Sequence, residues 1–140
     1  MASPSYGYKS GPREIRTYPV KSGETWANGD ILVLSSGYLA KAAAGGKPFG
    51  VAFGAVETAP SSDGLLSAQV DVSETALYYY AVGTGTITLA MQGTACDLAG
   101  DDTLDVTASA DDGFYIVQAD VTNNAAWVRL RASAVAAGVV

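Results

Sequence analysis

Few residues of this chain are suited to nucleophilic or acid–base chemistry. Its 140 residues include no histidine, which excludes the Ser-His-Asp and Cys-His arrangements and histidine-ligated zinc. Cys96 is the single cysteine, so it can form no internal disulfide, and we expect it to be a buried apolar residue. A serine–lysine pair would need a desolvated lysine, whereas Lys41 and Lys47 fall in a predicted hairpin and a glycine-rich loop.

Carboxylates are the remaining route to catalysis. Two adjacent pairs, Asp101-Asp102 and Asp111-Asp112, could supply the acid and base of a glycoside hydrolase. Neighbouring residues on a strand point to opposite faces, however, and aspartates before a glycine are typical of turns. The aspartates between residues 97 and 105 lack the spacing of a calcium loop. We therefore predict no catalytic residue, no cofactor and no metal site.

Composition and charge favour one small β domain with a basic beginning. Hydrophobic residues make up 49% of the chain and charged residues 16%, with 16 glycines, a balance that fits short strands and tight turns. The net charge is −6, yet four of the eight basic residues precede position 22: Lys9, Arg13, Arg16 and Lys21. An acidic body repels phosphate, so we expect no nucleic-acid partner. The apolar runs are too short to span a membrane, and the first ten residues do not resemble a signal peptide.

The beginning of the chain is predicted to be an extended arm over residues 1–17, followed by a single β domain over residues 18–140. Pro4, Gly7 and Gly11-Pro12 interrupt any regular pattern in the arm. Solvated tails are poor in aromatic residues, whereas this segment contains Tyr6 and Tyr8 and is followed directly by Tyr18. The arm is therefore predicted to dock on a neighbouring molecule that carries negative charge.

Periodicity along the body predicts an all-β fold of short antiparallel strands. Strands or extended segments are expected at residues 18–20, 30–34, 38–42, 49–56, 66–73, 77–82, 86–91, 113–119 and 125–132. Turns are expected at residues 28–29 and 35–37, and residues 92–110 are expected to be a loop with one short strand or helical turn. In the segment 49–56, Gly50, Ala52 and Gly54 leave one face almost without side chains, which permits close packing upon it.

Aromatic and basic residues near the beginning are the candidate contact residues. Tyrosine and tryptophan bury large areas at little entropic cost and dominate interface energies. We assign Tyr79 and Trp127 to the core instead. The predicted partner-binding residues are Tyr6, Tyr8, Arg13, Ile15, Arg16, Tyr18, Trp26 and Tyr38.

The stretch from residue 21 to residue 56 resembles head decoration, or cement, proteins of tailed bacteriophages. The residues that carry the resemblance are 29–34 (GDILVL), 36–42 (SGYLAKA) and 49–52 (FGVA), about a quarter of the chain. In that family such a stretch belongs to a compact, barrel-like β-tulip preceded by a capsid-binding arm. The resemblance implies a homotrimer, made in the host cytoplasm and seated on the virion exterior, that clamps neighbouring major capsid subunits. It implies no catalytic motif.

Two other functions stay open at this point. A carbohydrate-binding or adhesive β-module would stack sugars on Trp26, Tyr38 and the tyrosines at 78–80. An enzyme based on carboxylates would need two aspartate side chains that converge in one pocket. Both alternatives depend on where the fold places those side chains.

Overall fold

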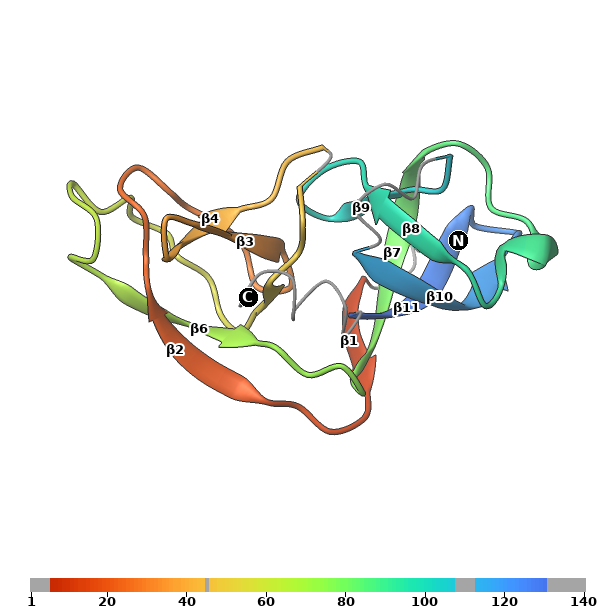
Figure 1. Ribbon diagram of the computed structural model, residues 1–140, viewed down its shortest axis with the longest axis horizontal. Helices are drawn as coiled ribbons and strands as arrows, with labels where there is room; N and C mark the ends of the chain where they lie inside the picture. Colours follow the sequence, from red (N-terminus) through yellow and green to blue (C-terminus); the bar gives the residue numbers. More distant parts are fainter. Residues whose placement is uncertain (1–5, 45, 108–112, 131–140) are drawn as a thin grey trace.

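The computed structural model describes residues 6–44, 46–107 and 113–130, which form an all-β fold with two sheets (Figure 1). The five-stranded sheet contains β2 (Ile15–Pro19), β3 (Ile31–Ser35), β4 (Tyr38–Lys41), β5 (Gly50–Ala52) and β6 (Ser67–Asp71). The six-stranded sheet contains β1 (Gly7–Ser10), β7 (Leu77–Thr84), β8 (Ala95–Leu98), β9 (Thr103–Asp105), β10 (Phe114–Asp120) and β11 (Ala125–Leu130). Within the described ranges the helical element is a short 3-10 turn, η1 (Leu89–Met91), and no helix is long and apolar enough to cross a membrane.

The five-stranded sheet has the order β2-β6-β5-β3-β4 and curls back on itself. Its β3–β4 hairpin turns at Ser36 and Gly37, whose φ angles of 52° and 88° are those of a two-residue hairpin turn. Beyond the end of β2, Val20 forms a bridge with Leu39, and the N–H of Lys21 donates to the Leu39 carbonyl. The first strand of this sheet is thus joined to the last.

The six-stranded sheet has the order β1-β7-β11-β10-β8-β9 and is ring-like, because β9 also pairs in parallel with β7. Its hairpin of β10 and β11 is the terminal hairpin predicted from the sequence. In β7, Tyr78 and Tyr80 point into the core, while Tyr79 between them faces the other way and contacts Trp127. This alternation follows from the two-residue period of a strand.

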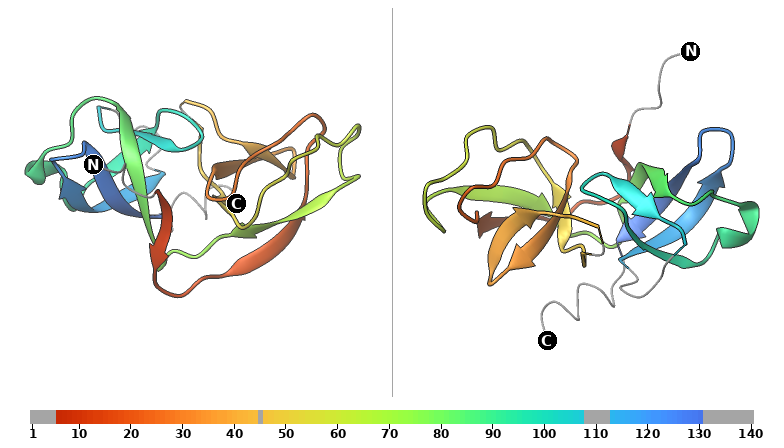
Figure 2. Two further views of the ribbon diagram at one scale, coloured as in Figure 1. Left: turned by 180° about the vertical axis from the view of Figure 1, so that it is seen from behind. Right: turned by 90° about the horizontal axis from the view of Figure 1, so that it is seen from above.

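Two crossing segments join the sheets, which lie side by side as two lobes (Figures 1 and 2). The first segment runs from β1 to β2 over residues 11–14, and the second runs from β6 to β7 over residues 72–76. The N–H of Val72 donates to the Glu14 carbonyl at 2.9 Å, and the Ser73 hydroxyl donates to the Pro12 carbonyl at 2.6 Å. The two crossings therefore support each other.

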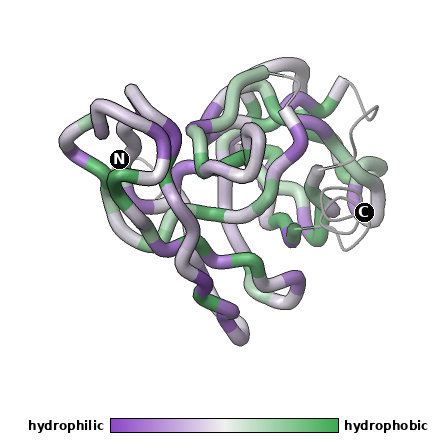
Figure 3. Tube along the Cα trace, turned by 60° about the vertical axis from the view of Figure 1, so that its left-hand side comes forward, coloured by the Kyte–Doolittle hydropathy of each residue, from purple (hydrophilic) through white to green (hydrophobic). Residues whose placement is uncertain are grey.

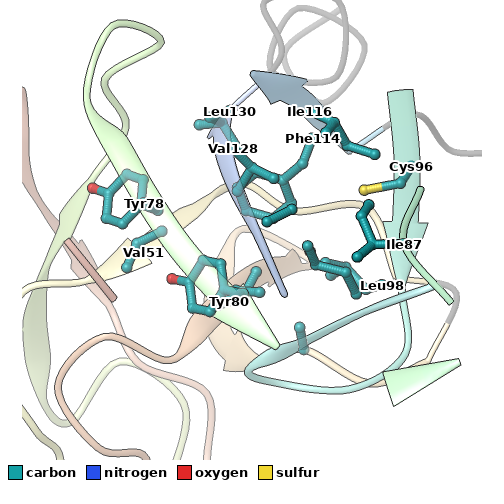
Figure 4. Packing of buried hydrophobic residues seen from close by; sticks show 14 of the residues in the cluster. Val51, Tyr78, Tyr80, Ile87, Cys96, Leu98, Phe114, Ile116, Val128 and Leu130 are labelled. Carbon is teal, nitrogen blue, oxygen red and sulfur yellow. The ribbon is translucent and has the colours of Figure 1, made fainter. Parts of the chain in front are cut away.

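The main hydrophobic core lies inside the six-stranded lobe and extends to the other lobe. Tyr80 packs against Phe114 there, and Ile31 and Val51 reach into the same cluster from the five-stranded sheet (Figure 4). Cys96 is fully buried in this core, as predicted. Apolar and polar residues alternate along the chain in Figure 3 rather than gathering in long runs.

Three expectations differ from the structure. Residues 86–91 do not form a strand, because they lead into η1, and residues 92–110 contribute both β8 and β9. The extended arm also needs correction for residues 6–17, which form β1 and part of β2 and pair with β7 and β6 of the same chain. The physical reason is that short edge strands gain backbone hydrogen bonds and aromatic packing there that a solvated arm would lack. Residues 1–5 lie outside the described residues.

Candidate functional site

Two tyrosines near the beginning of the chain pack against opposite faces of β7. The ring of Tyr6 stacks on Tyr79 with centroids 5.5 Å apart, while Tyr8 meets Tyr78 edge-on at 5.9 Å. Gly7 between them has a φ of 100°, a conformation that glycine adopts without strain. Both tyrosines stay exposed, Tyr6 at 45% and Tyr8 at 37%. They are anchored to the body and still present ring surface to solvent.

A cation–aromatic cluster continues from Tyr8 onto the other lobe. The guanidinium carbon of Arg13 lies 3.9 Å from the Tyr8 ring centroid and 4.8 Å from that of Phe53. Phe53 follows β5 and is 41% exposed. An arginine stacked on two aromatic rings is held in one orientation. Tyr8, Arg13 and Phe53 therefore form a continuous exposed surface across the junction of the two sheets.

The carboxylate of Asp71 fixes Arg13 in place. Asp71 is only 1% exposed, and its Oδ2 accepts a hydrogen bond from Arg13 Nε at 2.8 Å and another from the Tyr78 hydroxyl. Its Oδ1 accepts from the backbone N–H groups of Glu14 and Ser73, each at 3.0 Å. One buried carboxylate thus ties both crossing segments to β7. We call Asp71 and its four donors, which are Arg13, Tyr78 and the backbone N–H groups of Glu14 and Ser73, the Asp71 clasp.

The clasp makes stability depend on pH. Burial by itself would raise the pKa of Asp71, but the hydrogen bonds from Tyr78, Arg13 and the two backbone N–H groups outweigh it and lower that pKa. A lowered folded-state pKa gives stability that is present above the unfolded value, about 3.9, and is lost as the pH falls through the folded value.

We therefore expect the free energy of unfolding to fall more steeply with decreasing pH in the natural chain than in Asp71→Asn, between about pH 5 and pH 1. Urea unfolding at a series of pH values measures both slopes. Because both proteins share every other titrating group, the difference reports on Asp71. Equal slopes would show that the folded state does not prefer the ionised carboxylate.

The outer edge of β2 carries unpaired backbone groups. The Glu14 carbonyl accepts the Val72 N–H and the Val20 N–H donates to the Leu66 carbonyl, so both residues direct these groups to the side of β2 that faces β6. Residues alternate in this respect along an antiparallel strand. The N–H and C=O groups of Ile15 and Thr17 therefore point away from β6. β2 pairs only with β6, and the chain meets β4 beyond the end of β2, at Val20 and Lys21. The outward groups of Ile15 and Thr17 therefore face a free edge among the described residues. Pro19 ends this edge because proline has no N–H.

The structure does not bring all eight predicted contact residues to one surface. Trp26 is a correction: it is 4% exposed and packs in the second core cluster, with its Nε1 buried and unpartnered among the described residues. Tyr18 is half-buried against Phe49, and Tyr38 is half-buried beside Gly64. The remaining five lie along the first two strands and the crossing between them: Tyr6, Tyr8, Arg13, Ile15 and Arg16.

The basic residues are less free than the sequence indicates. Arg13 is bound to Asp71, and Arg16 pairs with Glu14 at 3.0 Å on the surface. Lys9 is exposed and lies 5.7 Å from the ring centroid of Tyr79. Of the three cations in β1, β2 and their crossing, Lys9 alone forms no ion pair within the described part of the chain, so it is the best placed to attract an external carboxylate.

Of the aspartates considered for catalysis, Asp101 lies beside the turn before β3, where its backbone carbonyl accepts the Ile31 N–H at 2.6 Å. The turn itself is closed by Asp30, whose carboxylate accepts the Ala27 N–H at 3.0 Å. Burial raises the pKa of Asp30 and of Asp102, while Lys41 lies 3.7 Å from Asp101. No group of three or more metal-binding side chains occurs in the part of the chain that the structure describes. Asp111 and Asp112 lie outside that part.

Sequence reasoning missed Phe53 and Asp71. The alternation of residues 66–73 places Asp71 with Ser67 and Gln69 on a solvent-facing side, and only the crossing segment that covers it makes it buried.

No protein-family model, curated protein or solved structure matches this chain. Its function must therefore be argued from the site.

Proposed function

We propose that the chain is a capsid decoration protein that binds the outer surface of a phage head and clamps neighbouring major capsid subunits. The observation that carries the proposal is the position of β1 and β2, which are consecutive in sequence and outermost in both sheets. A strand of the capsid protein adds to the free edge at Ile15 and Thr17, by β-augmentation. The first segment thus reaches a neighbour without leaving its own body.

Exposed apolar side chains near β1 and beyond β5 supply the anchors. Among the described residues, eight large apolar side chains are exposed, and five of them lie at the start of β1 or around the groove that follows β5: Tyr6, Tyr8, Phe53, Leu65 and Leu66. The groove has a volume of about 730 Å³ and begins at Phe53, the ring that Arg13 also contacts. A contiguous exposed apolar surface of this kind is typical of protein-binding sites.

The resemblance to cement proteins supplies the identity of the partner. Its three quoted segments coincide with the turn and strand of β3, with β4 and with β5, so they belong to one sheet. The β-tulip architecture and the homotrimer at three-fold capsid positions are part of the proposal. Many weak contacts of this kind, repeated over a head, resist internal pressure collectively.

Substituting Thr17 by proline tests whether a partner strand pairs with the outer edge of β2. The outward N–H of Thr17 is not needed by β6, so Thr17→Pro removes a donor for a partner strand while leaving the ladder to β6 in place. We expect Thr17→Pro to bind expanded capsids of the cognate phage at least about tenfold more weakly, the equivalent of about 1.4 kcal/mol. Co-sedimentation with capsids measures the occupancy.

Thr17→Val is the matched control, because it keeps both the N–H and the β-branched shape. It should decorate capsids like the natural chain, and thermal melting should show both variants folded. Equal decoration by a folded Thr17→Pro protein would overturn the proposed edge. Mass measurement in solution, before and after mixing with capsids, tests the trimer separately.

A further inference from the structure

A row of aromatic rings crosses the six-stranded sheet on the face opposite its core. The pairing register aligns Gly7 with Tyr79, Tyr79 with Trp127, and Trp127 with Gln118. The rings of Tyr79 and Trp127 are 4.8 Å apart, and Tyr6 stacks on the other side of Tyr79. Trp127 was expected to be a core residue, but it is only half-buried. The row leads from the first strand to the far end of this lobe.

A groove begins where this row ends. It has a volume of about 820 Å³, within the size range of small-ligand sites. Its lining includes Trp127, Leu89 and the polar residues Gln118, Asp120, Thr86 and Thr122. The groove is formed by the ends of β10 and β11 together with the segment before η1. It is separate from the free edge of β2.

The polar groups of this groove are held in defined positions. Asp120 accepts hydrogen bonds from the Tyr79 hydroxyl at 2.5 Å and from Asn123 Nδ2 at 2.8 Å, and these bonds lower its pKa. Its other oxygen, Oδ1, accepts the Asn123 N–H at 3.2 Å. The carboxylate is ionised at neutral pH, and Oδ1 keeps a lone pair for a further donor. The side chain of Gln118 is exposed and has no hydrogen bond among the described residues. Its amide offers a donor and an acceptor.

We propose that this groove binds a neutral oligosaccharide. The C–H face of a pyranose ring packs on an aromatic ring such as Trp127, while its hydroxyl pairs donate to a carboxylate and bond with a planar amide. Asp120 and Gln118 supply those two groups beside the indole. The net charge of −6 and the carboxylate itself disfavour acidic sugars.

The mixture of groups separates a sugar from other occupants. A purely apolar ligand would leave the side-chain amide of Gln118 desolvated without a hydrogen-bond partner, and a phosphate would be repelled by the carboxylate of Asp120. A saccharide presents alternating apolar faces and hydroxyl edges, which match the indole and the planar polar side chains. The carbohydrate module considered from the sequence relied on Trp26, which is buried; the site inferred here uses a different tryptophan.

A glycan array followed by calorimetric titration tests the inference. The probes are immobilised neutral oligosaccharides of glucose, galactose, mannose and N-acetylglucosamine, and the best-retained one is then titrated in solution. We expect Trp127→Ala to weaken its binding about tenfold or more. Gln118→Ala should weaken it less while leaving the melting temperature nearly unchanged, because the exposed Gln118 side chain makes no hydrogen bond within the described residues.

Tyr115→Ala is the control, since Tyr115 is another exposed aromatic residue of β10 that does not line the groove. It should bind like the natural chain. Retention of no neutral glycan would overturn the inference, and so would binding that neither Trp127→Ala nor Gln118→Ala weakens. Neither result bears on the Thr17→Pro experiment, so oligosaccharide binding and capsid decoration are tested separately.

Discussion

Replacing Asp71 by alanine is expected to lower the free energy of unfolding by about 3–5 kcal/mol. The substitution removes the acceptor of four hydrogen bonds, from Arg13, Tyr78 and the backbone N–H groups of Glu14 and Ser73. The buried Tyr78 hydroxyl and the half-buried Arg13 guanidinium would keep the cost of their desolvation and lose the hydrogen bonds that offset it. Urea denaturation followed by fluorescence measures the change.

Glu74→Ala is the matched control, because Glu74 is an exposed carboxylate three residues away. It should change the free energy of unfolding by less than about 0.5 kcal/mol. A double-mutant cycle with Arg13→Ala should give a large coupling energy, since the pair shares one hydrogen bond in a buried site. A loss at Asp71 no larger than that at Glu74 would mean that the clasp does not hold the crossings together.

The clasp also links stability to the proposed capsid contact. Arg13 is oriented by Asp71 and stacks on Tyr8 and Phe53, so the exposed surface depends on a buried carboxylate. Loosening the clasp would release β1 and β2 together, because residues 11–14 join them. The surface is therefore preorganised, and a partner would not have to order it on binding.

Elements defined by local patterns were predictable from the sequence. The β3–β4 hairpin follows from a Ser36-Gly37 turn between two apolar runs, and the β10–β11 hairpin follows from alternation on both sides of a polar turn. The inward and outward tyrosines of β7 follow from the period of two. In each case neighbouring residues decide the structure.

Features that depend on distant partners were not predictable. Residues 7–10 and 15–17 belong to a segment whose glycine and proline signals indicate an irregular arm, yet β7 and β6 offer them edges to pair with. Asp71 looks solvent-facing in its own strand and is buried by a segment almost sixty residues earlier. Residues 86–91 alternate like a strand, but Leu89 is exposed in η1 rather than paired. Tertiary context overrides local preference at these places.

The small-residue face predicted for residues 49–56 has a packing partner at Gly50. A Cβ added there would lie 2.6 Å from the Asp71 carbonyl oxygen and 2.6 Å from Val70 Cγ2. Gly50 is buried in β5, between β3 and β6, so neither neighbouring backbone can move away freely. The absence of a side chain lets β6 approach at the position that carries the clasp.

Gly50→Ala is therefore expected to destabilise the fold by about 1–3 kcal/mol, although alanine is normally the better residue in a strand. Gly100→Ala is the control: its added Cβ meets only the Thr103 hydroxyl, at 3.1 Å, and that side chain can rotate. Because the clash at Gly50 displaces Asp71, the double substitution with Asp71→Ala should cost less than the sum of the single ones. Strict additivity would mean that packing at β5 and the clasp stabilise the fold independently, and that the junction of the two lobes is not one cooperative unit.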